Sequence, residues 1–307
     1  MIDVNFNPSF SLEHLIPQIR KTALLPNEER IAHILADRWI GYSKAQEAIS
    51  KLQKLIDHPK RQRMPNLLIV GPTNNGKSMI IEKFKRMHKS ISKENVPKEI
   101  MPIVSLQMPS DPTIARFYAM LLYNLGAPVT MKCKVADLEH VALKLLKHLS
   151  TRMIIIDELH NILAGRINVQ REFLNLIRFI GNELQIPIVC LGIREAYHAI
   201  RTDDQLENRF EPHILPLWED DREFSSLLVS ITSALPLKKP SFLLEKEIRE
   251  YILRKTEATI GEIISLISRT AILAIESGQE NIDLKLLMQA DYDSPTERRN
   301  KFERELN

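Results

Sequence analysis

Residues 71–78 combine two glycines, a lysine and a serine at the spacing that a phosphate-binding loop requires, directly after a short apolar run. Gly71 and Gly76 would allow the backbone to curl until its N–H groups converge on phosphate oxygens. Lys77 would supply charge at the β and γ phosphates of ATP, and the Ser78 hydroxyl is a suitable hard ligand for Mg²⁺. We expect the whole loop to contribute to this nucleotide site: Gly71, Pro72, Thr73, Asn74, Asn75, Gly76, Lys77 and Ser78.

A second apolar run, residues 153–156, ends in the acidic pair Asp157 and Glu158. Such a run predicts a strand buried on both faces. We expect Asp157 to bind the nucleotide and complete the Mg²⁺ shell with Ser78, and Glu158 to polarise a water for attack on the γ phosphate. For this run in isolation, two solvated acids would be an equal alternative. The lone His160 that follows is expected to be a hydrogen-bonding group and not a catalytic one.

The composition is that of a globular chain of 307 residues, 44% hydrophobic and 26% charged, which is enough for one large domain or two modest ones. Its two cysteines, Cys133 and Cys190, offer no disulfide framework, which favours a reducing cytoplasm. No apolar run approaches the length of a membrane span, so we expect a cytoplasmic protein without membrane contact. The net charge of +3 permits nucleic acid as a partner without requiring it.

Alternating apolar runs and helical periodicity predict an α/β fold with a three-layer, mainly parallel sheet of five strands. A sheet of this kind carries its site at the carboxyl ends of the strands. Four of the strands can be placed from the sequence, at residues 66–70, 102–107, 153–156 and 187–191.

From Asp220 onward the pattern changes to helices without a strand signal, at about residues 221–234, 242–256, 260–277 and 283–290. This region is expected to be a C-terminal all-helical lid. The first 25 residues are punctuated by prolines and are expected to form an irregular arm, followed by helices from about Asn27 and from Ser43. The expected segments are an N-terminal arm with helices (1–59), an ATPase core (60–219), the lid (220–290) and a tail (291–307).

The chain resembles the AAA+ ATPases in the order of its parts. These are a phosphate-binding loop, an acidic strand, a further strand, an arginine-containing segment and a helical lid. Several stretches narrow the resemblance to the TniB/TnsC family of transposition ATPases, over residues from about 50 to 300. These stretches are Arg63 to Ser78, Asp157-Glu-Leu-His-Asn with Gly165, Arg171-Glu-Phe-Leu-Asn-Leu-Ile-Arg, Gly192-Ile-Arg-Glu-Ala, Arg209-Phe210, and Ser294-Pro-Thr-Glu-Arg-Arg.

The resemblance implies an ATP-dependent regulator that oligomerises on target double-stranded DNA as a ring or filament. It also implies that this assembly works with a target-selection protein, recruits and activates a DDE transposase, and uses ATP hydrolysis for disassembly or target control. Hydrolysis is expected to be slow and to be stimulated by assembly. Composition and periodicity indicate none of these properties by themselves.

The same resemblance assigns Arg209 to the arginine finger that acts on the γ phosphate bound by a neighbouring subunit. Such an arginine can contribute about 10³ to 10⁵ in rate, so hydrolysis would depend on assembly. The alternative is that Arg209 pairs on the surface with Asp204 or Glu211.

Two positions depart from the pattern of the resembled superfamily. The strand at 187–191 is followed by Gly192, where many relatives end the strand with a polar sensor side chain. In the lid, Ile264 occupies the position three residues after Gly261 at which an arginine is common. Arg269 could take over that contact, although a role on the lid surface is favoured.

DNA contacts are expected after the second strand, where DNA-binding relatives carry their pore elements. The candidate phosphate contacts are Arg116, Lys132 and Lys134. The basic residues of the helix that follows the phosphate loop, from Lys83 to Lys89, are the second candidate for DNA contact. They are less favoured because such a helix normally packs on the sheet, and its charges then form a solvated face.

Two alternative functions remain open at the level of sequence. One is a related AAA+ helicase loader or secretion-associated ATPase. The other is a nucleotide-gated scaffold with negligible hydrolysis, in which Glu158 would be dispensable.

Overall fold

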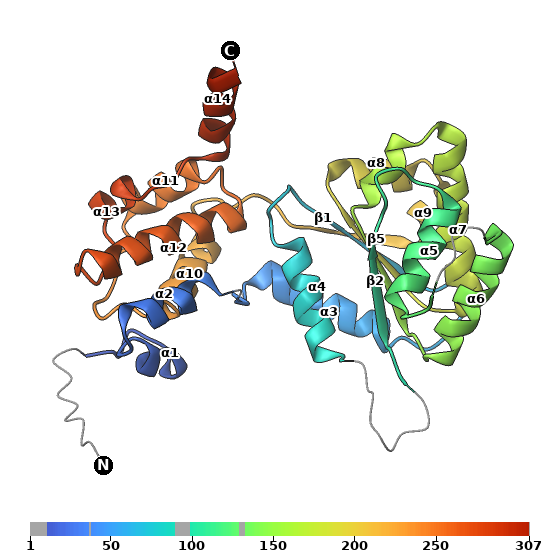
Figure 1. Ribbon diagram of the computed structural model, residues 1–307, viewed down its shortest axis with the longest axis horizontal. Coiled ribbons are helices and arrows are strands. Elements are labelled where there is room, and N and C mark those ends of the chain that lie inside the picture. The colour runs from blue at the N-terminus through green and yellow to red at the C-terminus, as the bar shows by residue number, and fades with distance from the viewer. Residues whose placement is uncertain (1–10, 37, 90–98, 129–132, 307) are drawn as a thin grey trace. The chain divides into compact units, whose positions relative to one another are not determined.

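The computed structural model describes residues 11–36, 38–89, 99–128 and 133–306 (Figure 1). The chain divides into two compact units. The first comprises Met1–Ser43 together with Leu217–Asn307, and the second comprises Lys44–Pro216. We call them the helical unit and the sheet unit.

The described residues of the sheet unit form five strands in the order β2-β3-β4-β1-β5, and all of the pairings are parallel. The strands are β1 (Asn66–Val70), β2 (Ile103–Gln107), β3 (Met153–Asp157), β4 (Ile188–Gly192) and β5 (Phe210–Ile214). The predicted α/β fold with a parallel sheet is thus confirmed. The sequence had not located β5, which lies at the edge of the sheet, where a strand tolerates Pro212 and exposed polar residues.

Side chains of the central strands alternate between the two faces of the sheet. Ile154 and Ile156 of β3 and Cys190 of β4 join one core cluster with the helices α5 (Ile114–Asn124), α6 (Val135–His148) and α7 (Ile167–Leu184). On the opposite face, Ile155 and Leu191 line a cavity together with Ile81 of α4 (Lys77–Met87). The sheet therefore forms the middle of three layers (Figure 1).

The remaining helices of the sheet unit complete these outer layers. The helix α3 (Ser43–Ile56) lies next to the end of α4, where a ring nitrogen of His88 is 2.8 Å from Gln53 Oε1. The short helices η1 (Leu159–Ala164), α8 (Arg194–Arg201) and α9 (Asp204–Glu207) follow β3 and β4 and belong to the layer formed by α5, α6 and α7.

The helical unit packs α2 (Asn27–Leu35) together with the predicted lid helices. These are α10 (Arg222–Ser233), α11 (Lys246–Lys255), α12 (Ile260–Glu276) and α13 (Leu284–Gln289), and their apolar faces form one core that includes Ile34. The C-terminal helix α14 (Pro295–Leu306) has no buried residue, and its Arg298 pairs with Glu262 of α12 at 2.7 Å.

The N-terminal segment differs from its prediction in two ways. Residues expected to form an irregular arm include the helix α1 (Pro17–Thr22), and Leu15, Ile19 and Ala23 are buried together. The sequence also placed residues 1–59 in one segment, whereas the structure groups α1 and α2 with the helical unit and residues 44–59 with the sheet unit.

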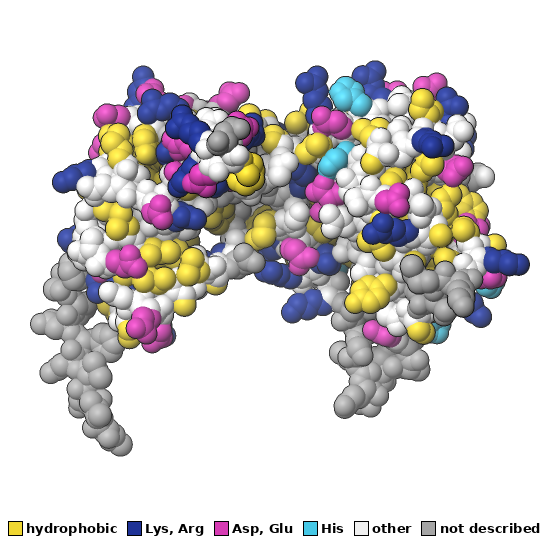
Figure 2. Space-filling view, turned by 45° about the horizontal axis from the view of Figure 1, so that its top comes forward, with side chains coloured by type: hydrophobic (Ala, Val, Ile, Leu, Met, Phe, Trp, Pro, Cys, Tyr) yellow, Lys and Arg dark blue, Asp and Glu magenta, His cyan; other side chains and the backbone are white. Residues whose placement is uncertain are grey.

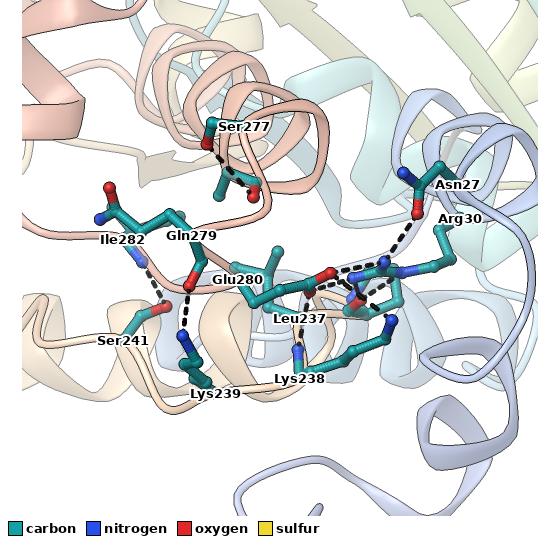
Figure 3. A network of polar contacts seen from close by, with 12 residues as sticks. Asn27, Arg30, Leu237, Lys238, Lys239, Ser241, Ser277, Gln279, Glu280 and Ile282 are labelled. Atoms are coloured by element: carbon teal, nitrogen blue, oxygen red, sulfur yellow. Dashed lines mark hydrogen bonds and ion pairs between the residues drawn. The ribbon is translucent and has the colours of Figure 1, made fainter. Parts of the chain in front are cut away.

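A buried ion pair links α2 to Glu280, which lies 250 residues after Arg30 in the sequence. Arg30 is fully buried and donates hydrogen bonds to both carboxylate oxygens of Glu280 and to Pro236 O, the latter at 3.0 and 2.8 Å (Figure 3). Lys238 N also donates to Glu280 Oε2 at 3.2 Å. Burial alone would raise the pKa of Glu280, but the hydrogen bonds from Arg30 and Lys238 outweigh it and hold the pKa below its usual value.

Within the described part of the chain, no single helix is long and apolar enough to cross a membrane. The helices α11 and α12 have sufficient length and apolar composition only when they are taken together, and they are bent by 116° relative to each other. Nine residues of α12 are buried in the protein, as expected for a core helix.

Replacing Glu280 by glutamine should destabilise the helical unit, because Arg30 would keep its charge in a buried site without a carboxylate partner. Breaking a buried pair in this way costs about 3–5 kcal/mol. Both tryptophans, Trp39 and Trp218, belong to this unit, so denaturant unfolding followed by tryptophan fluorescence reports on it directly. Because the pKa of folded Glu280 is lowered, this stabilisation is present above a pH of about 4.3 and is lost as the pH falls further.

Glu250→Gln is the matched control, since Glu250 forms an exposed pair with Lys246 in the same unit. It should change the free energy of unfolding by less than about 1 kcal/mol. Equal effects of the two substitutions would show that the Arg30 network does not stabilise this unit.

Candidate functional site

The predicted phosphate loop lies between β1 and α4 and is tied to the two neighbouring strands. Gly71 N donates to Gly192 O, at the end of β4, at 3.2 Å. Gly76 has the left-handed φ of 84° immediately before α4, a conformation that favours glycine. The loop therefore ends with backbone N–H groups at a helix N-terminus, the local arrangement that binds phosphate.

Asn75 and Gly71 fix the loop against the segment that leaves β5. Asn75 Nδ2 donates to Leu215 O at 3.0 Å and to Pro216 O at 2.9 Å, and its side chain is buried. A Cβ atom at position 71 would lie 2.9 Å from Leu215 O, so only glycine fits there. These contacts hold the loop in shape without any contribution from a ligand.

Lys77 is 7% exposed and its Nζ donates to Gly71 O and Pro72 O, each at 2.7 Å. Burial lowers the pKa of Lys77, although the carboxylates of Glu158 and Asp157 act in the opposite direction. A charge that is already removed from water interacts strongly with phosphate oxygens, because the local dielectric screens it little.

The other predicted ligands lie beside the loop, at the carboxyl end of β3. Ser78 Oγ donates to Asp157 Oδ2 at 3.3 Å, so the two predicted Mg²⁺ ligands are adjacent. The backbone N–H of Glu158 donates to Asp157 Oδ1 at 2.8 Å and orients that carboxylate. Among the described residues, no group of three or more His, Cys, Asp and Glu could hold a metal ion. A hydroxyl and one carboxylate nevertheless fit Mg²⁺, which usually binds through one or two protein ligands, substrate phosphates and water.

Glu158 has the left-handed φ of 54°, which is uncommon for a residue with a side chain. Its carboxylate Oε2 lies 3.2 Å from His160 Nε2. Sequence reasoning expected His160 to be a hydrogen-bonding group. The structure places it in contact with Glu158, a neighbour that the sequence could not identify. That contact depends on the turn that the left-handed residue creates.

A cavity of about 650 Å³ extends from Ser78 and Asp157 between α4 and α5. Its lining is mostly apolar and includes Ile155 of β3 and Leu191 of β4. Arg116 of α5 also lines it. The structure thus places Arg116, predicted to contact DNA, on the same cavity as the two predicted metal ligands.

Of the other two predicted DNA contacts, Lys134 is among the described residues. Lys134 is exposed and directly precedes α6, while Lys132 lies outside the described residues. On the face shown in Figure 2, basic side chains are interspersed with acidic ones and do not form a continuous stripe. On α4, Lys85 pairs with Glu82 at 3.0 Å.

Arg209 lies at the opposite end of the sheet from the phosphate loop. It directly precedes β5, whose first residue Phe210 pairs with Asn66, the first residue of β1. A five-residue strand spans about 16 Å at roughly 3.3 Å per residue, so Arg209 is remote from the loop of its own chain. Its Nη1 donates to Asn182 Oδ1 at 2.8 Å, and not to Asp204 or Glu211.

Arg209 belongs to a group of guanidinium side chains. Partial burial and the nearby charges of Arg63 and Arg178 lower the pKa of Arg209, while Asp203 acts in the opposite direction. Arg178 donates to the neutral acceptors Gln205 Oε1 at 2.5 Å and Asn175 Oδ1 at 2.6 Å. Positive charge is therefore concentrated around Arg209.

The two positions that depart from the superfamily pattern are also defined by the structure. Gly192 ends β4, and a Cβ atom there would lie 2.5 Å from Ala196 Cβ, so a side chain is excluded. In the helical unit, Arg269 Nη1 donates to Asp291 O at 2.7 Å, a contact within that unit.

The family described as Bacterial TniB protein matches the chain over residues 30–220. No curated protein matches it. Among solved structures, the Aeropyrum pernix ORC1 protein in complex with DNA is 14% identical, with a TM-score of 0.58, over 84% of this chain and 68% of that one. The Aeropyrum pernix ORC2 protein in ADPNP-ADP complexes is 13% identical, with a TM-score of 0.57, over 84% and 70%.

Pyrobaculum aerophilum CDC6P is 14% identical, with a TM-score of 0.57, over 81% of this chain and 67% of that one. Identities this low show the fold alone. That fold is the AAA+ fold, a parallel five-stranded sheet with a helical C-terminal region, as the sequence predicted.

Lys77 and Glu158 should differ in their effects on nucleotide binding, because one charge binds the triphosphate and the other is expected to act mainly in the transition state. We expect Lys77→Ala to lose ATP binding, and Glu158→Gln to bind ATP with nearly wild-type affinity while its turnover falls at least 100-fold. Fluorescent ATP titration and phosphate release measure the two quantities. Equal losses of ATP affinity in both variants would contradict these roles.

Proposed function

The chain belongs to the TniB family of bacterial proteins, and we propose that it is an ATP-dependent, DNA-binding AAA+ regulator of transposition. In this proposal it oligomerises on target double-stranded DNA, recruits and activates a DDE transposase, and communicates with a target-selection protein. Hydrolysis of ATP disassembles the complex or controls the target. The protein works in the cytoplasm.

The observation that carries the ATPase part is the convergence of four predicted side chains at the carboxyl ends of β1 and β3. Lys77 is buried beside the loop, Ser78 bonds to Asp157, and Glu158 directly follows Asp157. Lys77 would bind the β and γ phosphates, and Glu158 would accept a proton from the attacking water. Bound Mg²⁺, held by Ser78 and Asp157, would supply charge neutralisation for the phosphates.

The position of Arg209 supports the oligomeric part of the proposal. Arg209 directly precedes β5 and is therefore remote from the phosphate loop of its own chain. If it contacts a γ phosphate at all, the nucleotide must be bound by another subunit. The positive charges of Arg63 and Arg178 around it would favour the approach of such an anion.

The DNA and transposase parts rest on the family and on structural similarity. The family connects the chain to transposition, and the Aeropyrum pernix ORC1 protein with the same fold was solved in complex with DNA. We place the phosphate contacts at Arg116, Lys132 and Lys134. Because the assembly is expected to follow the backbone of a duplex, these contacts would carry little sequence preference.

Composite active sites should form when two inactive variants are mixed. Arg209→Ala subunits are expected to bind ATP normally and to hydrolyse it at least 100-fold more slowly, because the γ phosphate loses a positive contact in the transition state. Lys77→Ala subunits cannot bind ATP but carry an intact Arg209. Phosphate release measured across mixing ratios should therefore exceed that of either variant alone.

Arg201→Ala is the matched control, since Arg201 is exposed and pairs with Glu207 within its own chain. It should retain the wild-type rate. Absence of complementation at every ratio, with co-assembly verified by crosslinking, would reject the assignment of Arg209.

The affinity for duplex DNA should fall steeply with salt, because each neutralised phosphate contributes about −0.9 to the log–log slope. Replacing Arg116, Lys132 and Lys134 together by alanine should reduce the magnitude of the slope by about 2.7, that is 3 × 0.9, at saturating ATP, which is needed because Arg116 lines the same cavity as Ser78 and Asp157. Fluorescence anisotropy over a salt series measures this slope.

A second experiment tests recruitment of the transposase. Purified DDE transposase should be retained on DNA by wild-type protein with ATP, and not by the triple variant.

Replacing Lys83, Arg86 and Lys89 by alanine tests the second candidate surface. If this variant loses part of the salt slope and the variant of the first three residues keeps the wild-type slope, DNA lies along α4. Wild-type assemblies on DNA that retain no transposase would contradict the proposed role in transposition.

A further inference from the structure

His160 occupies a defined position next to the residue expected to activate water. It lies in η1, two residues after Glu158, and its Nε2 is 3.2 Å from Glu158 Oε2. Its side chain is 22% exposed, whereas that of Glu158 is 38% exposed. The imidazole is thus the more enclosed partner, and it contacts the carboxylate from the protein side.

The turn that carries both residues is anchored by its own backbone and by β2. Asn161 N donates to Glu158 O at 2.9 Å, and Asn161 Nδ2 donates to Met108 O, just beyond β2, at 2.9 Å. Leu159 and Ile162 are fully buried on either side of His160. The imidazole therefore has little freedom to move away from the carboxylate.

The two ring nitrogens of His160 have different surroundings. In the described part of the chain, Nδ1 is buried without a hydrogen-bond partner. A Cβ atom at Gly192 would lie 3.5 Å from Nδ1 and only 2.5 Å from Ala196 Cβ, so no side chain fits at that position. A side chain at position 192 therefore cannot compete with Glu158 for the imidazole. Since a carboxylate only accepts hydrogen bonds, the neutral imidazole that favours this contact carries its proton on Nε2.

We propose that His160 is a positioning residue that holds the Glu158 carboxylate, through one of its oxygens, in the orientation needed to activate water. This inference rests on the proposed ATPase function and deepens it. With a proton on Nε2, this 3.2 Å contact would engage Oε2 and leave Oε1 to accept the proton of the water. A carboxylate fixed in this way needs no reorganisation before proton transfer.

The consequence is specific to turnover. His160 contacts the base and not the phosphate loop, so its loss should lower kcat and leave the affinity for ATP unchanged. A hydrogen bond to a charged group is among the stronger ones in proteins, and loss of its positioning effect should reduce kcat about 10-fold or more.

Two amide substitutions separate the position of the donor from its chemistry. The amide nitrogen of glutamine falls close to imidazole Nε2, whereas that of asparagine falls close to Nδ1. His160→Gln should therefore retain most of the wild-type kcat, and His160→Asn should lose about 10-fold or more. We would measure steady-state ATP hydrolysis by the full chain with Mg²⁺ and duplex DNA, and ATP affinity by fluorescence titration.

The control and the double variant define the outcomes. His140→Asn changes an exposed histidine on α6 and should leave kcat unchanged. In a Glu158→Gln background, His160→Asn should have no further effect on kcat, because the two residues act as a unit.

Two results would overturn the inference. One is equal kcat values for His160→Gln and His160→Asn, and the other is a double variant in which the two losses of kcat are additive. Loss of ATP affinity in either His160 variant would also overturn it. If Glu158→Gln itself leaves hydrolysis intact, the proposed ATPase mechanism fails instead.

Discussion

The site depends on one constraint, the parallel pairing of β1 with β4 on one side and β5 on the other. Parallel strands bring their carboxyl ends to the same edge, and the phosphate loop is tied to both neighbours there. Gly71 N bonds to Gly192 O, and Asn75 bonds to Leu215 O and Pro216 O beyond β5. Because a Cβ atom at position 71 would press on Leu215 O, the pairing itself requires glycine at the start of the loop.

This fixed edge also sets the charge balance of the site. Burial disfavours the charge on Lys77, while Asp157 and Glu158 at the end of β3 favour it. The carboxylates are themselves positioned by backbone contacts, as in the hydrogen bond from Glu158 N to Asp157 Oδ1. Lys77 of the loop and the two carboxylates at the end of β3 thus place opposite charges near each other at this edge.

The parts of the molecule that could be predicted from the sequence are those in which local pattern and structure coincide. The loop and the acidic strand are continuous motifs, and four strands and the lid helices have clear periodicity. β5 could not be located because Pro212 and its polar neighbours lack an apolar run. The placement of α2 depends on Arg30 and Glu280, which are 250 residues apart and share no local signal. Likewise, the contact between Glu158 and His160 depends on a left-handed residue that nothing in the sequence marks.

The surroundings of Arg209 carry the argument for assembly beyond its position in the chain. Arg209 donates to the neutral amide of Asn182, which lies on α7. Arg178, also on α7, donates to neutral acceptors, and its Nη1 is 3.9 Å from Asp203 Oδ2. Partial burial, together with repulsion from Arg63 and Arg178, lowers the pKa of Arg209. An anion brought by another subunit would relieve that repulsion. In the proposed function, the γ phosphate of ATP is that anion, so nucleotide binding in one subunit would stabilise its contact with the next.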